Sequence, residues 1–166
     1  MKRNFKLVAL TAATALTAGL LVAGASAKEV KIGVVLTYSG GAAHFGEQIG
    51  RGMDLYIKQH PEAFGGHTVK LIKRDSKRPG GDIAKNAVQE LITREKVDLL
   101  TGFVFSPNAM ASAPLATKGK VPMVIMNAGT AWIPSLSPYI ARVSFTMWHS
   151  GYPMGKYAHD KLGCKT

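Results

Sequence analysis

The chain has 166 residues and a formal net charge of +11, because 21 Lys and Arg residues face only 10 Asp and Glu residues. Its single cysteine, Cys164, excludes an internal disulfide and with it the disulfide-rich class of small exported domains. The length is sufficient for one domain with a hydrophobic core of its own.

The first 27 residues have the pattern of a secretory signal peptide. A basic start (Lys2, Arg3 and Lys6) precedes an apolar stretch over residues 7–23, and Ala25-Ser26-Ala27 fits an A-x-A cleavage site. A single membrane-spanning helix is the alternative, which the many Thr and Gly residues and the small-residue end disfavour. We therefore expect an exported, soluble product that carries about +8 and has no cysteine at the cut for a lipid anchor.

The segment after the leader has the pattern that opens an open α/β sheet. An apolar run over residues 32–36, uninterrupted by polar residues, is typical of a strand buried on both faces. A loop with two adjacent glycines follows, and then come apolar residues at helical spacing, namely Ile49, Met53, Tyr56 and Ile57. Ligands of such sheets bind outside the carboxyl ends of the strands, so this loop is the first candidate for a binding site.

Four further strands and three further helices are expected downstream. The strands are predicted over residues 68–73, 97–104, 121–126 and 139–145. Residues 82–92 carry the most regular apolar stripe, with Asp82 as the N-cap. The next helix is expected to begin with Ser106 as its N-cap and to bend or end early at Pro114, and a last short helix covers residues 154–162.

Strands that alternate with helices predict a parallel sheet covered on both faces, of the doubly wound α/β class. We expect the strand order 2-1-3-4-5, in which the winding direction reverses between the first and third strands. That order places the loops over residues 37–45 and 105–108 beside one another, with residues 127–130 next along. Three polar loops at one crevice predict a ligand site.

Two roles are open for Ser106 in that crevice. It serves only to cap its helix, or it also turns its hydroxyl and the free N–H groups of the helix start toward an anion such as a carboxylate. Thr130 adds a hydroxyl and backbone donors, although an ordinary loop threonine is an equal alternative. Phe45 shields an apolar ligand tail, or else it belongs to the core. A few neutral donors hold a buried carboxylate through charge-assisted bonds, so no lysine or arginine is required.

The sequence offers little for other classes of function. It lacks the G-x-G-x-x-G, P-loop and G-x-S-x-G motifs, and no nucleophile stands beside a base. Its five histidines are scattered without ligand spacing, so we expect no metal and no cofactor. The densest basic cluster, over residues 70–78, has no interleaved aromatics, which favours a solvated rim over nucleic-acid binding. We therefore expect a binding protein and not an enzyme; a flavodoxin-like enzyme is the remaining catalytic alternative.

Several segments resemble, in their order and spacing, the branched-chain amino-acid (leucine-binding-protein-like) family of ABC-importer receptors, which are type I periplasmic solute-binding proteins. The likeness runs from about Lys31 to Leu162. It rests on Ile32–Gly40, Phe45-Gly46, Arg51–Asp54, Gly102–Ser106, Asn127–Thr130, Ser137–Arg142 and Met154–Tyr157. The resemblance implies the amino-terminal lobe of such a receptor, a periplasmic location, and delivery of a small ligand to an inner-membrane ABC permease.

The resemblance also implies which residues bind the ligand. Family members hold the ligand carboxylate with a serine at the Ser106 position and with backbone and hydroxyl groups at the Ala128 and Thr130 positions, while an aromatic residue at the Phe45 position shields the ligand side chain. We add three adjoining residues to the predicted ligand-binding set, namely Pro107, Asn108 and Gly129. A branched-chain or aliphatic amino acid is the implied ligand. Because Pro107-Asn108 replaces the Ser-Ser-type run common in amino-acid binders, an aromatic carboxylate is the second choice.

Receptors of this family have two lobes and about twice this length, which sets the expected domains. We expect a ligand-binding lobe over residues 28–148 and, over residues 149–166, the hinge crossover and first helix of a second lobe that this chain lacks. Met154, Tyr157 and Leu162 are then expected to be exposed. A truncated fragment without independent function and a sensory ligand-binding module are the alternatives to half of an importer receptor site.

Overall fold

The structure is a computed structural model that describes residues 27–165. Its strands and α-helices are, in chain order, β1 (Glu29–Leu36), α1 (Ala43–Gln59), β2 (Thr68–Asp75), α2 (Asp82–Glu90), β3 (Leu99–Gly102), α3 (Ser106–Gly119), β4 (Met123–Ile125), β5 (Ile140–Arg142) and α4 (Met147–Leu162). Short 3₁₀ turns are η1 (Gly40–Ala42), η2 (Pro61–Phe64) and η4 (Ile133–Leu136), and a π turn, η3 (Leu91–Glu95), extends α2. The predicted leader lies almost entirely outside the described residues.

The five strands form one parallel sheet in the order β2-β1-β3-β4-β5. This confirms the predicted fold class and strand order. The longest pair, β1 and β2, is in register from Glu29 with Thr68 to Leu36 with Asp75. β2 is an edge strand, as its alternation predicts, and it carries exposed lysines at positions 70 and 73 that disfavour pairing with another sheet.

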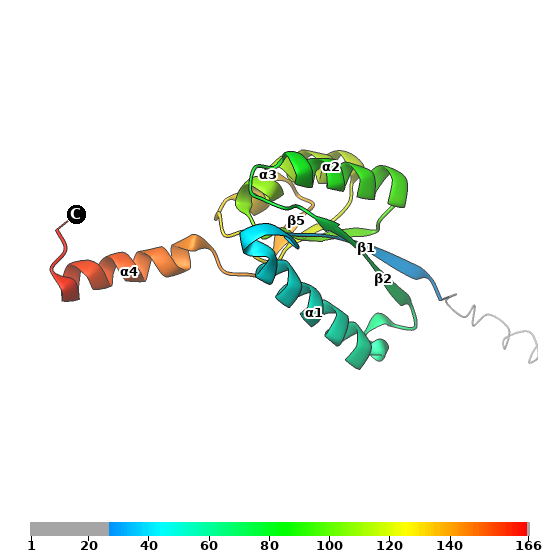
Figure 1. Cartoon of the computed structure of the whole chain (residues 1–166), viewed down its shortest axis with the longest axis horizontal. Coiled ribbons are helices and arrows are strands. Elements are labelled where there is room, and N and C mark those ends of the chain that lie inside the picture. Colours follow the sequence, from blue (N-terminus) through cyan, green and yellow to red (C-terminus); the bar gives the residue numbers. More distant parts are fainter. Residues whose placement is uncertain (1–26, 166) are drawn as a thin grey trace, which may run out of the picture.

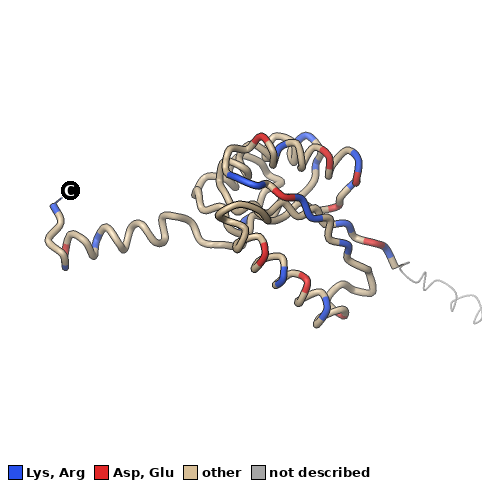
Figure 2. The backbone as a smooth tube through the Cα atoms, viewed as in Figure 1, with Lys and Arg blue, Asp and Glu red and all other residues tan. Residues whose placement is uncertain are grey.

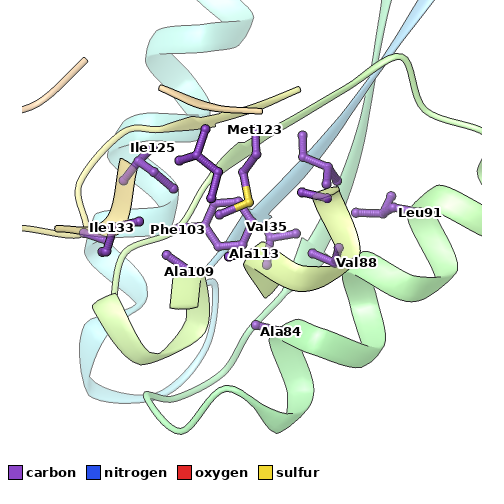
Figure 3. Close-up of a cluster of buried hydrophobic side chains, with 14 of the residues drawn as sticks. Val35, Ala84, Val88, Leu91, Phe103, Ala109, Ala113, Met123, Ile125 and Ile133 are labelled. Atoms are coloured by element: carbon purple, nitrogen blue, oxygen red, sulfur yellow. The ribbon is translucent and has the colours of Figure 1, made fainter. Parts of the chain in front are cut away.

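The helices cover the two faces of the sheet unequally: α2 and α3 lie together on one face, and α1 lies on the other (Figure 1). The larger core is on the α2–α3 face, where Phe103 lies among Val35, Met123, Ile125 and small residues of α3 (Figure 3). Buried alanines at positions 109, 113 and 116 let α3 approach the sheet closely. The smaller core, on the α1 face, has only Val34, Leu36 and Val104 fully enclosed.

Several predicted element boundaries are wrong. α3 continues through Pro114 to Gly119, although proline leaves the Met110 carbonyl without its helical donor. Gly81, not Asp82, is the N-cap of α2, because its φ of +90° suits glycine and Asp82 already lies in the helix. The last three strands of the sheet are also shorter than predicted, with three or four residues each.

α4 is longer than predicted and extends away from the body of the lobe (Figure 1). It begins at Met147 with a capping box between Thr146 and His149, and it continues through Pro153. It has no buried residue, and its large apolar side chains are more than half exposed, namely Trp148, Tyr152, Met154, Tyr157 and Leu162. The predicted exposure of the last three is therefore confirmed.

Charged side chains of both signs are interspersed over α1, α2 and the β1–β2 side of the lobe, whereas the first half of α4 carries none (Figure 2). Basic residues of the 70–78 segment have acidic partners on neighbouring elements: Lys73 with Asp54, and Arg74 with Glu90 and Glu95. Within residues 27–165, no helix is both long and apolar enough to cross a membrane.

Candidate functional site

The exits of β1 and β3 are held tightly together at the point where the winding direction of the sheet reverses. The Phe103 N–H donates to the Val35 carbonyl at 2.7 Å. Gly102 has a φ of +111°, and a Cβ there would lie 2.5 Å from the Val35 carbonyl oxygen. Only glycine fits this approach, so the chain leaves β3 at a fixed place beside β1.

The loop after β4 is attached along the exit of β3 by three hydrogen bonds. The Met126 N–H donates to the Gly102 carbonyl at 2.9 Å and the Ala128 N–H to the Phe103 carbonyl at 2.9 Å, while Asn127 Nδ2 reaches the Val104 carbonyl at 2.9 Å. The loop over residues 127–131 therefore lies directly beside the start of α3.

Ser106 joins these two segments. Its Oγ accepts the Thr130 N–H at 3.2 Å across 24 residues of sequence. The prediction that Ser106 is the N-cap is wrong, because Phe105 occupies that position with extended backbone and Ser106 is the first helical residue. Since the hydroxyl accepts from Thr130, its own hydrogen is free to donate to an incoming oxygen.

Ala128 and Gly129 are held by the scaffold through their backbone. Ala128 is 1% exposed and its N–H is already used, which leaves only its carbonyl for a ligand. The Gly129 carbonyl accepts the Met147 N–H at 2.8 Å, and a Cβ on Gly129 would lie 3.0 Å from Met147 Cγ and Sδ. Glycine at this position lets the start of α4 lie against the loop.

Asn108 does not face the predicted crevice. Its side chain is 1% exposed; Oδ1 accepts the Gly81 N–H at 3.0 Å and Nδ2 donates to the Arg78 carbonyl at 3.1 Å. These bonds hold the turn between β2 and α2, so the structure corrects its assignment as a ligand contact. The neighbouring Pro107 is exposed and has no N–H to offer.

Phe45 lies in the first turn of α1, beside the exit of β1. Gly46 contacts that exit so closely that a Cβ would lie 2.1 Å from the Thr37 carbonyl oxygen. The Phe45 ring is 38% exposed, with its centroid 4.2 Å from that of His44, so it is not a core residue. The topology puts Phe45 at the same sheet edge as Ser106 and Thr130.

The loop after β1 uses its polar groups internally. Asp75, at the end of β2, accepts the Tyr38 and Lys77 N–H groups, each at 2.8 Å. Burial alone would raise the pKa of the Asp75 carboxyl, but hydrogen bonds from Ser39 and from these N–H groups lower it overall. The Thr37 and Ser76 hydroxyls form a buried bond of 2.9 Å. This loop supports the edge of the site without exposing charge to it.

Two further features lie outside the predicted set. An apolar groove of about 400 Å³ lies between α1 and the sheet, lined by residues such as Ile49, Met53 and Leu71; it has almost no polar surface to orient a carboxylate. Arg142, which sequence reasoning missed, donates from Nη2 to the Thr130 carbonyl at 2.6 Å. A basic residue that ends the strand next to the polar loop is the signal that could have identified it.

Within residues 27–165, no three His, Cys, Asp or Glu side chains come together in a way that could hold a metal ion. The exits of β3 and β4 bring together the Ser106 hydroxyl, the backbone of residues 128–130, the first turn of α3 and Arg142. Hydroxyl groups and the positive end of a helix are suited to non-covalent binding of a small anion.

Ligands of doubly wound sheets bind at the switch point, and here the Ser106 hydroxyl and the Thr130 N–H meet at that point. Residues 29–166 match the family described as "Periplasmic binding protein", and the chain belongs to that family. It is 40% identical over 156 residues to the Leu/Ile/Val-binding protein homolog 6 of Brucella abortus (strain 2308), a match that covers 94% of this chain and 40% of that protein.

Solved structures of solute-binding proteins are also similar to this chain. A solute-binding protein of an ABC transporter from R. palustris, in complex with 4-hydroxybenzoate, is 45% identical with a TM-score of 0.76, over 80% of this chain and 36% of that one. A leucine-binding protein from Thermotoga maritima MSB8 is 32% identical with a TM-score of 0.75, over 82% of this chain and 38% of that one. The chain thus spans about 40% of the length of the relatives it matches.

Proposed function

We propose that this chain carries one wall of the ligand site of an ABC-importer receptor that captures a small carboxylate in the periplasm. The observation that carries the proposal is the pairing of Ser106 Oγ with the Thr130 N–H at the switch point. The Ser106 hydroxyl accepts one bond and so becomes a better donor, and a carboxylate is the acceptor that gains most from it. The ligand is then passed to an inner-membrane permease.

We rank an aromatic carboxylate ahead of a branched-chain amino acid as the ligand. The relative in complex with 4-hydroxybenzoate is 45% identical, against 32% for the leucine-binding protein. The exposed Phe45 ring is a suitable surface for an aromatic or aliphatic ligand body. The Thr130 hydroxyl and the Gly129 backbone complete the proposed contacts, and Pro107 adds an apolar rim.

One wall is expected to bind weakly. A receptor that binds at about 1 μM gains about −8 kcal/mol, and half of the contacts correspond to about −4 kcal/mol, which is near 1 mM. Calorimetry with 4-hydroxybenzoate and with leucine tests this, with Ser106→Ala as the informative variant and Ser135→Ala, an exposed serine, as the control. Removing the Ser106 donor costs about 1.5–3 kcal/mol of carboxylate binding.

The affinity of the unmodified chain and the effect of Ser106→Ala test separate parts of the proposal. Millimolar binding that Ser106→Ala abolishes and Ser135→Ala retains supports the proposal. Binding that survives Ser106→Ala contradicts the assignment of that residue, and micromolar binding by the unmodified chain contradicts the one-wall argument. Reading the coding DNA beyond the Thr166 codon, for a continuing frame with a second α/β pattern, tests whether the same polypeptide supplies the opposing wall.

A further inference from the structure

We propose that Arg142 is a positioning residue of the carboxylate site: it fixes the loop over residues 127–131 and supplies the positive charge that makes the site prefer an anion. The inference rests on the proposed function and adds a residue to it. Arg142 ends β5 opposite Ile125 in β4, so it lies at the same sheet edge as the loop. Its Nη2 donates to the Thr130 carbonyl at 2.6 Å and to the Ala131 carbonyl at 3.4 Å.

Thr130 is held on both sides by the segment from Arg142 to Met147. The peptide group before Thr130 gives its N–H to Ser106 and its carbonyl to the Met147 N–H at 2.8 Å. The peptide group after Thr130 gives its carbonyl to Arg142. The orientation of the Thr130 N–H toward Ser106, and with it the direction of the Ser106 hydroxyl, therefore depends on two contacts from one segment.

The charge of Arg142 is uncompensated. Its Nε and Nη1 are buried without a hydrogen-bond partner, and within residues 27–165 it forms no ion pair with Asp or Glu. Arg74, by contrast, has two carboxylate partners. A guanidinium is charged at all accessible pH values, and in partly buried surroundings its field is weakly screened. A carboxylate bound at Ser106 and Thr130 would lie within that field.

A purely structural arginine and a charge-supplying one predict different behaviour. A structural role lowers the affinity for every ligand of the same shape equally, because the loop is displaced for all of them. A charge-supplying role lowers the affinity for a carboxylate and leaves a neutral isostere almost unchanged. The ratio of 4-hydroxybenzoate to 4-hydroxybenzamide affinity therefore distinguishes the two.

The purified chain is titrated with both compounds by NMR, at low and high salt. The proteins compared are wild type, Arg142→Gln, Arg142→Lys and Arg94→Gln. Arg94→Gln is the control, because it removes the same charge from an exposed position. We expect Arg142→Gln to weaken both ligands, because the loop is released, and to weaken 4-hydroxybenzoate about tenfold more than the amide, because only the carboxylate also loses the charge. Arg142→Lys keeps most of the preference, and Arg94→Gln changes neither ligand. Equal weakening of both ligands, or no weakening, overturns the proposal.

Hydrogen exchange of the Thr130 amide gives a second readout that needs no ligand. Arg142→Gln is expected to speed this exchange about tenfold while amides in the centre of β1 keep their protection, because only the loop is released. Unchanged exchange refutes the positioning role. If wild type binds neither compound, the proposed function fails while exchange at Thr130 still decides whether Arg142 fixes the loop. If Arg142→Gln does not fold, Arg142→Lys, which keeps the charge but not the guanidinium fork, is expected to speed Thr130 exchange and to keep the carboxylate preference; unchanged exchange or loss of the preference overturns the proposal.

Discussion

Replacing Asn108 by alanine tests whether this buried amide serves the scaffold. The Gly81 N–H and the Arg78 carbonyl lose their partners, at 3.0 and 3.1 Å, in a place that Ala111 covers closely. An unsatisfied buried donor costs about 1–3 kcal/mol, and the lost second bond and the small cavity add about 1 kcal/mol. We therefore expect Asn108→Ala to lower the free energy of unfolding by about 2–4 kcal/mol.

Urea unfolding followed by circular dichroism measures this change. The midpoint should fall with an unchanged slope, because the surface exposed on unfolding hardly changes. Asn86→Ala, at an exposed position of α2, is the matched control and should stay within about 0.5 kcal/mol of wild type. Asn108→Asp keeps the acceptor for Gly81 but sets two acceptors together at Arg78, so a comparable loss is expected. A loss below about 0.5 kcal/mol for Asn108→Ala would refute the reasoning.

Three further predictions concern the edge of the site. Gly102→Ala should unfold the lobe or destabilise it by more than about 3 kcal/mol in urea, because its Cβ would meet the Val35 carbonyl; wild-type stability would contradict this close approach. Tyr38→Phe should be neutral or stabilising by about 1 kcal/mol, since its buried hydroxyl has no hydrogen-bond partner among residues 27–165. Burial, followed by nearby carboxylates, raises the pKa of Tyr38 to about 12, and a loss in thermal unfolding would show a missing bond. The pKa of Asp75 is lower in the folded than in the unfolded protein, so it contributes stability that is present above the unfolded pKa and is lost as pH falls through the folded pKa. Asp75→Asn should therefore flatten the acid side of the stability curve below about pH 4. An unchanged pH profile would count against this contribution.

The sequence predicted the sheet because its strands and helices carry clear and separate periodicities. The apolar run of β1 and the alternation of β2 identify a buried centre and an exposed edge, and short crossovers then leave few strand orders. The prediction that the helix bends or ends early at Pro114 is wrong because a proline removes only one helical hydrogen bond. The packing of the small residues of α3 against the sheet outweighs that loss.

The site was predicted less completely, because side-chain directions depend on tertiary contacts. Ser106 and Thr130 do meet, as loops at a switch point should, but the serine binds the neighbouring loop and does not cap its own helix. Asn108 looks equally available in the sequence, yet it turns inward toward a β2–α2 turn that is far away in the chain. Arg142 was missed for the same reason: its partner carbonyls belong to a loop that precedes it by more than ten residues.

Ligand binding at the switch point is tested by locating the ligand on the surface of the chain. A two-dimensional NMR titration with 4-hydroxybenzoate follows every backbone amide at once. We expect the largest shift changes at Ser106, Gly129 and Thr130, with millimolar saturation, and we expect them to vanish in Ser106→Ala. Changes confined to the apolar groove beside α1, or an identical response in Ser106→Ala, would contradict binding at the switch point.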